Sequence, residues 1–288
     1  MAGAAAEHTL EQETPMQKTF STPEPIALYV EIGSGDITLH ADDVTETVVD
    51  VDGKGADETV VEQRGDQIVV IGPRRGGGFL GGGGQLSVHV TLPTRSNLAT
   101  KLGSADLGVR GTLGSCSLKT GSGDIGLEDV DGDLLVESGS GDLGIRAVTG
   151  DTRVKSGSGD IRAERFDGDA SISTGSGDVE IGVAAGGVQV KSGSGDMRVR
   201  EARDGVGLST ASGDLVVDLL ARGELHANNV SGDIRVGVPA GIPVWTDVST
   251  VTGSVRSSLH GAGQPEEGQD FIELRAKTVS GDISLEQL

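Results

Sequence analysis

Apolar and polar residues alternate along most of this chain in short segments, and one segment returns at a fixed interval. Thr120–Ile125 reads TGSGDI, and close copies of it follow every 18 residues. Alternation bounded by glycines is typical of β-strands with one buried face. The fixed period predicts a stack of similar structural units and not a closed globule.

Each period also contains a weaker half-repeat. Asp131–Leu134 reads DGDL and lies nine residues after the SGDI of Ser122–Ile125. One unit is therefore expected to be a coil of two short strands joined by two turns. When the coils are aligned, apolar residues fall into columns that we expect to face inward, such as Leu107, Ile125, Leu143, Ile161, Val179, Met197 and Leu215.

These columns predict an all-β fold. We expect a single-chain parallel β-solenoid, like a β-helix or β-roll, with 18-residue coils and irregular β caps at both ends. Neighbouring coils of such a stack lie about 4.8 Å apart. Because parallel crossovers are right-handed in about 98% of cases, we expect a right-handed solenoid.

Four regions are predicted along the chain. They are a disordered leader (1–19), an N-terminal β cap with the first coils (20–103), the regular solenoid (104–237), and C-terminal coils with a cap (238–288). The pattern leaves open whether Met16 is the true start. Trp245, the only tryptophan, follows a break in the period and is expected to plug the last regular coil.

Two stretches predict loops. Gly76–Gly84 is almost all glycine, which is typical of a flexible loop. A phosphate-binding loop is the alternative, but the stretch lacks the Gly-Lys-Ser/Thr ending and the helix that such a loop needs. Gly261–Gln269 is polar and is expected to form an exposed loop.

Composition narrows the function classes. The chain has 288 residues, 48 of them Gly, and a formal net charge of −21. Nucleic-acid and anionic-membrane binding both rest on Lys and Arg, so the charge argues against both and favours a basic partner. No apolar run reaches the ~18 residues of a membrane helix, and Met1–Glu7 does not resemble a signal peptide. We therefore expect a cytoplasmic protein without membrane insertion.

The single cysteine, Cys116, falls in an inward column and is expected to be a small core side chain.

The aspartates that end the repeat form a column of candidate site residues. Stacked carboxylates repel one another, so something must offset the repulsion. The first interpretation is structural: an Asp after Gly accepts hydrogen bonds from turn N–H groups. The second is calcium held between coils, because the half-coil is similar in spacing to the β-roll nonapeptide. That motif, however, places a residue between Gly and Asp, and Gly123 is followed directly by Asp124. The calcium candidates are Asp124, Asp142, Asp160, Asp178, Asp196 and Asp214.

Enzyme chemistry is not expected, and the sequence offers no catalytic or cofactor-binding residue. No nucleophile elbow is present. The carboxylates are copied in every coil, whereas an active site is normally unique. The histidines lack metal-ligand spacing and are scattered at His8, His40, His89, His226 and His260.

The repeat resembles a known family. Its Ser-Gly-Asp-Ile-x-Leu units, as in Ser122–Leu127, with Asp-Gly-Asp between them, are similar to the bacterial putative-adhesin β-strand-repeat family, a domain of unknown function. Met16–Pro23 is similar to the start of its cytosolic members. The resemblance covers about residues 20–288 and implies a β-solenoid and a scaffold or partner-binding role in envelope-stress or regulatory contexts. The word adhesin implies a surface protein, whereas this chain shows no export signal.

The sequence thus leads to a non-enzymatic β-solenoid scaffold or protein-interaction module. Its expected partner is another protein, more basic than acidic, and no cofactor is required. A calcium-binding β-roll whose Asp ladder holds ions is the alternative. A carbohydrate-active solenoid enzyme is the second alternative. The sequence indicates neither the identity of the partner nor the oligomeric state.

Overall fold

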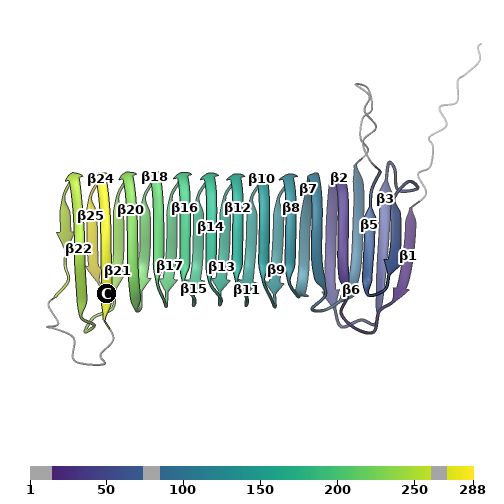
Figure 1. Cartoon of the computed structure of the whole chain (residues 1–288), viewed down its shortest axis with the longest axis horizontal. Helices are drawn as coiled ribbons and strands as arrows, with labels where there is room; N and C mark the ends of the chain where they lie inside the picture. Colours follow the sequence, from purple (N-terminus) through teal and green to yellow (C-terminus); the bar gives the residue numbers. More distant parts are fainter. Residues whose placement is uncertain (1–14, 74–84, 261–270) are drawn as a thin grey trace, which may run out of the picture.

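The computed structural model describes residues 15–73, 85–260 and 271–288. These residues form a long, flattened β-solenoid with β1 at one end and β22 at the other (Figure 1). Their regular elements are all β-strands, and none of the described residues forms a helix that could cross a membrane. The predicted all-β solenoid is confirmed, and its right-handedness stays a prediction.

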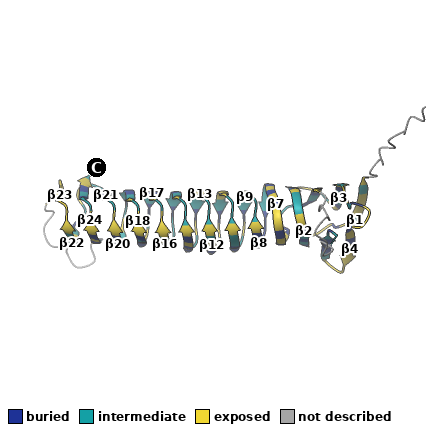
Figure 2. Cartoon of the chain, turned by 90° about the horizontal axis from the view of Figure 1, so that it is seen from above, coloured by how far each residue is buried: buried dark blue, intermediate teal, exposed yellow. Residues whose placement is uncertain are grey.

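Each regular coil contributes one strand to each of two layers, which run along the solenoid side by side (Figure 2). Within a layer the strands are parallel, in a register of 18 residues that places Leu143 beside Ile161. Layer A consists of β8 (Cys116–Ser122), β10 (Leu134–Ser140), β12 (Thr152–Ser158), β14 (Ala170–Ser176), β16 (Val188–Ser194), β18 (Val206–Ser212) and β20 (Gly223–Ser231). Layer B consists of β9 (Ile125–Val130), β11 (Leu143–Val148), β13 (Ile161–Phe166), β15 (Val179–Ala184), β17 (Met197–Ala202), β19 (Leu215–Leu220) and β21 (Ile234–Val238).

The inward columns form one continuous core between the layers. Ile125, Leu143 and Ile161 are all buried, and Phe166, the largest fully buried side chain, lies in the same core. Because successive residues of a strand face opposite sides, the residues between these columns face solvent. The predicted inward columns are confirmed, and Cys116 is buried among them.

Two corners complete each coil. The Ser-Gly-Asp corner leads from layer A to layer B. The glycine directly before its aspartate has a positive φ, which is 120° at Gly141. A Cβ at Gly141 would lie 2.2 Å from the carbonyl oxygen of Gly123 in the preceding coil. Both the backbone conformation and the close stacking therefore require glycine. The Asp-Gly-Asp corner leads from layer B back to layer A of the next coil.

Antiparallel strands close the N-terminal end. β2 (Ala27–Asp42) and β7 (Asn97–Leu113) each run around a corner and take part in both layers. Beyond β2, layer A continues with β5 (Gln67–Ile71) and β4 (Val60–Arg64), and layer B continues with β6 (Leu86–Pro93), β3 (Glu46–Gly53) and β1 (Met16–Ser21).

The predicted leader is wrong in its last residues. Met16 to Thr19 belong to β1, which pairs with Glu46–Val51 of β3 because its backbone completes the edge of layer B. Residues 1–14 lie outside the described residues, as do the predicted loops at Gly76–Gly84 and Gly261–Gln269.

At the C-terminal end the order of the coils differs from the order of the chain. β24 (Ile272–Ser280) and β25 (Ile283–Gln287) pair with β20 and β21. β22 (Val244–Thr252) and β23 (Val255–Ser257) lie outside them, at the left of Figure 2. The last segment of the chain is thus inserted between two earlier ones.

The expectation that Trp245 plugs the core is wrong. Its side chain is 51% exposed, and the guanidinium carbon of Arg275 lies 5.5 Å from its ring centre. Alternate residues of β22 face opposite sides of the layer, and Val244 and Val248 are the ones that pack against the core. Trp245 therefore lies on the outer surface.

Candidate binding groove and aspartate ladders

The aspartates of the Ser-Gly-Asp corners form a continuous hydrogen-bonded ladder. The backbone N–H of Asp142 donates to Oδ1 of Asp124 with an N–O distance of 2.8 Å, and the N–H of Asp160 donates to Oδ1 of Asp142 at 2.9 Å. Each carboxylate thus accepts a charge-assisted hydrogen bond from the next coil, which offsets the repulsion along the column. The same bond recurs at Asp106, Asp160, Asp178, Asp196, Asp214 and Asp233.

Hydrogen bonding lowers the pKa of Asp160 below its ordinary value. The backbone N–H of Asp178 is the main cause, and the Arg162 guanidinium, 2.8 Å from the carboxylate, adds to it. The interpretation of these aspartates as acceptors of backbone N–H groups is thus correct in kind. The donor, however, belongs to the next coil and not to the turn of the same Asp.

The calcium candidates Asp124, Asp142, Asp160, Asp178, Asp196 and Asp214 all lie in this ladder. Calcium takes six to eight oxygen ligands. No group of three or more His, Cys, Asp or Glu side chains among the described residues is placed to hold a metal ion. The ladder brings the six aspartates into one row without gathering them around a point.

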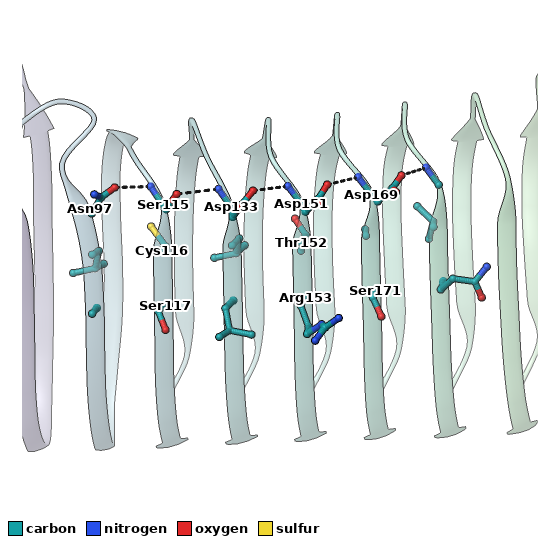
Figure 3. A pocket seen from close by; sticks show the side chains of 18 of the residues that line it. Asn97, Ser115, Cys116, Ser117, Asp133, Asp151, Thr152, Arg153, Asp169 and Ser171 are labelled. Atoms are coloured by element: carbon teal, nitrogen blue, oxygen red, sulfur yellow. Dashed lines mark hydrogen bonds between the residues drawn. The ribbon is translucent and has the colours of Figure 1, made fainter.

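A second ladder, which the sequence analysis did not assign, runs along the Asp-Gly-Asp corners (Figure 3). The N–H of Ser115 donates to Oδ1 of Asn97 at 2.9 Å, and the N–H of Asp151 donates to Oδ1 of Asp133 at 3.0 Å. The row ends where Gly187 donates to Asp169 at 2.9 Å, because glycine has no side chain to continue it. The signal was present in the sequence, since these residues also recur every 18 positions.

A groove of about 970 Å³ lies beside this second ladder, on the outer surface of layer A. It is lined from β2 to β20 by outward-facing residues, several of them small: Ala99, Ser117, Leu135, Arg153, Ser171 and Gln189. Eight strand spacings of about 4.8 Å make it about 38 Å long. That length is matched by an extended peptide of about eleven residues at 3.3 Å per residue.

The groove is strongly acidic. Asp133, Asp151, Asp169, Asp204 and Glu224 line it, against Arg153 and His226. Asp133, Asp151 and Asp169 are exposed, and within the described ranges none of the three forms an ion pair. Each uses one oxygen to accept the N–H of the next coil, and its second oxygen has no hydrogen-bond partner among the described residues.

A second groove, of about 910 Å³, lies on the opposite layer and has a different character. Its lining includes Arg146, Arg162, Glu180 and Arg200. These cations are paired: Arg200 lies 2.5 Å from Glu180, and Arg146 contacts Asp129. The arginines of this groove are thus compensated, whereas the carboxylates of Asp133, Asp151 and Asp169 in the layer A groove have no cationic partner among the described residues.

Comparison with protein-family models identifies the family of this chain. The family model described as Toastrack DUF4097 matches residues 24–286. The chain belongs to the Toastrack family. The resemblance to a putative-adhesin-like β-repeat family is thus confirmed at the level of the family, while the Ser-Gly-Asp signature stays a prediction for its other members. The search of curated proteins found no match to this Toastrack chain.

Several solved structures align with nearly the whole Toastrack chain. One is a putative lipid binding protein from Parabacteroides distasonis, 17% identical over 95% of this chain and 96% of that chain, with a TM-score of 0.44. Another is a putative adhesin from Bacteroides fragilis, 12% identical over 96% and 97%, with a TM-score of 0.38.

Cys116 also lines the floor of the groove in this Toastrack chain, but it belongs to the core. It is 4% exposed, and burial raises the pKa of its thiol to about 12. The thiolate is the nucleophilic form of cysteine, so such a thiol is inert at neutral pH. His226, at the β20 end of the groove, lies 3.4 Å from Glu224.

Proposed function

We propose that this chain is a non-enzymatic β-solenoid scaffold that binds a basic protein segment in the layer A groove. The observation that carries the proposal is the row of unpaired carboxylates of Asp133, Asp151 and Asp169 along that groove. Lys or Arg side chains of an extended partner would pair with these oxygens. The groove is open and about 38 Å long, which favours a chain over a small molecule.

The repetition of the groove supports a scaffold over an enzyme. Its carboxylates recur with the coil period, so no one position is distinguished from its neighbours as an active site would be. The surface of the groove is also rigid, because the strands that form it are hydrogen-bonded to a neighbour on both sides. A rigid surface binds without a large ordering cost on its own side. The cytoplasmic location expected from the sequence is part of this proposal.

The experiment is photo-crosslinking from defined positions in the organism that encodes the chain. A photoreactive residue replaces Ser171, which is exposed on the floor of the groove. The matched control replaces Glu164, which is exposed on layer B and lines the opposite groove. We expect one discrete protein adduct from position 171 and none of the same mass from position 164.

The adduct is then tested for its dependence on charge. Replacing Asp133, Asp151 and Asp169 together by Asn keeps the ladder acceptor, as Asn97 demonstrates, and removes three charges. The adduct from position 171 should be lost in this variant. An adduct that persists there, or that forms equally from position 164, would overturn the proposal.

A further inference from the structure

The two ends of the solenoid are closed differently. At the N-terminal end, β1 and β4 are antiparallel to their neighbours, and Lys18 Nζ on β1 donates to the carbonyl oxygen of Val61 on β4 at 2.8 Å. Met16 and Phe20 of β1 pack against the core. At the C-terminal end, β22 pairs with β24 and with no other strand of the described residues. Its outer edge is therefore an open edge of a parallel layer.

The core is also exposed at this end. Ile272 and Ala276 of β24 are fully buried, whereas their register partners on β22, Val244 and Val248, are only partly covered. Val255 of β23, which pairs with the buried Ile283, is 44% exposed. The large hydrophobic side chains that are exposed concentrate in the last coils, at Val230, Trp245, Val251, Val255, Phe271, Val279 and Leu288.

The charges at this end are neutralised locally, although the chain carries −21. Asp247 of β22 lies 3.2 Å from Lys277, and Arg256 of β23 lies 3.0 Å from Asp282. Two copies of an acidic protein repel one another over most of their surfaces. The ion pairs of β22 and β23 lower the repulsion that two copies would meet at the C-terminal end.

We propose that a second copy of this chain docks on this end, with β22 antiparallel to β22 of the second copy around a twofold axis through Val248. The residues of β22 suit this register. Trp245 then faces Val251 of the second copy, Thr246 faces Thr250, and Asp247 faces Ser249. Aromatic–β-branched and Thr–Thr pairs are favourable across antiparallel strands.

The twofold geometry also explains why the assembly stops at two. An isologous contact uses the same surface on both copies and closes on itself. The axis is normal to both layers, so β23 meets β23 of the second copy while β22 meets β22, and the exposed core is covered on both sides. A head-to-tail stack would instead place β22 against the N-terminal strands β1 or β4 of another copy, and such a contact would repeat without closing.

Another segment of the chain could compete for this edge. Residues 261–270 read GAGQPEEGQD and contain no Val, Leu, Ile or aromatic residue that could cover Val248 or Val255. A second copy supplies such residues in register. The dimer carries two layer A grooves on one scaffold, independently of what those grooves bind.

The experiment is sedimentation of the full chain over a wide range of protein concentrations. We expect a species of twice the 29.2 kDa chain mass that dissociates on dilution. The test variant is Val251→Asp, which changes an outward residue that is 76% exposed. The control is Val230→Asp, because Val230 occupies the same column on β20, two coils further in, and is 54% exposed.

Val251→Asp should abolish the dimer and Val230→Asp should leave it intact. A second measurement fixes the register: the double variant Asp247→Cys/Ser249→Cys should form a reducible covalent dimer on oxidation. A wild-type chain that stays monomeric, a dimer that survives Val251→Asp, or growth into larger polymers would each overturn the proposal.

Discussion

The glycines of the Ser-Gly-Asp corner give the sharpest prediction about the fold. We expect Gly141→Ala to destabilise the solenoid strongly. Gly141 has a φ of 120°, a conformation that costs an L-residue about 1–3 kcal/mol. The new Cβ would also lie 2.2 Å from the carbonyl oxygen of Gly123. That oxygen belongs to the backbone of the neighbouring coil, so relief requires a backbone shift that costs about 1–3 kcal/mol more. The combined loss is about 2–6 kcal/mol of unfolding free energy.

The matched control is Gly144→Ala, three residues further along. Gly144 lies on the outer face of β11, and the nearest atom to its new Cβ is the carbonyl oxygen of Ile125 at 4.0 Å. This change should be neutral or stabilise by up to about 1 kcal/mol, because it restricts the unfolded chain. Urea unfolding followed by far-UV circular dichroism measures both variants. If the two unfold within about 0.5 kcal/mol of each other, the role assigned to the corner glycine is refuted.

Three further predictions concern single groups and ions. The pKa of Asp160 is lowered by the N–H of Asp178 and then by Arg162, so its contribution to stability is present above the unfolded value of about 3.9 and is lost as the pH falls through the folded value. The difference in urea midpoint between wild type and Asp160→Asn should therefore shrink on acidification; a difference that grows would contradict this. Because burial raises the pKa of Cys116 to about 12, a thiol reagent at neutral pH should modify it only in urea, and equal rates in the native protein would be inconsistent with a core position. The melting temperature should be the same in EDTA and in millimolar calcium, because the ladder carboxylates are satisfied by backbone N–H groups; a large rise with calcium would favour the β-roll alternative.

Periodicity predicted the regular part of the fold well. The 18-residue interval gave the register of Leu143 beside Ile161 directly, since in-register parallel stacking places equivalent residues next to one another. Local hydrogen bonding was harder to predict. An Asp in a turn can accept from its own turn or from the next coil, and nothing in the repeat distinguishes the two donors.

The ends departed from the prediction because they depart from the period. The structure places β24 and β25 inside β22 and β23, an order that the period does not indicate. One signal in the sequence agrees with this order. Asp282 retains the aspartate of the Ser-Gly-Asp corner, whereas Ser254 replaces it in the other copy. The N–H of Ser254 donates to Oδ1 of Asp282 at 2.9 Å, and the ladder ends at Ser254 because it has no carboxylate. Trp245 was misplaced because its position after the break in the period suggested a plug, while the alternation of β22 directs it outward.

The second ladder shows how a binding surface can be hidden in a structural repeat. Asn97 and Asp133 occupy equivalent positions and both accept an N–H of the next coil. The repeat therefore needs the acceptor and not the charge at these corners. The charge of Asp133, Asp151 and Asp169 is free to serve another purpose, which we propose is the recognition of a basic segment.

The most direct test of this account is the affinity of a Lys-rich peptide of about eleven residues for two charge-matched variants, measured by fluorescence anisotropy. One variant changes Asp133, Asp151 and Asp169 to Asn, and the other changes Asp124, Asp142 and Asp178, which lie along the other corner. Three exposed ion pairs of about 0.2–1 kcal/mol each predict about a tenfold weaker binding for the first variant and little change for the second. Equal losses in both variants would mean that the peptide senses only the net charge, and the layer A groove would not be its binding site.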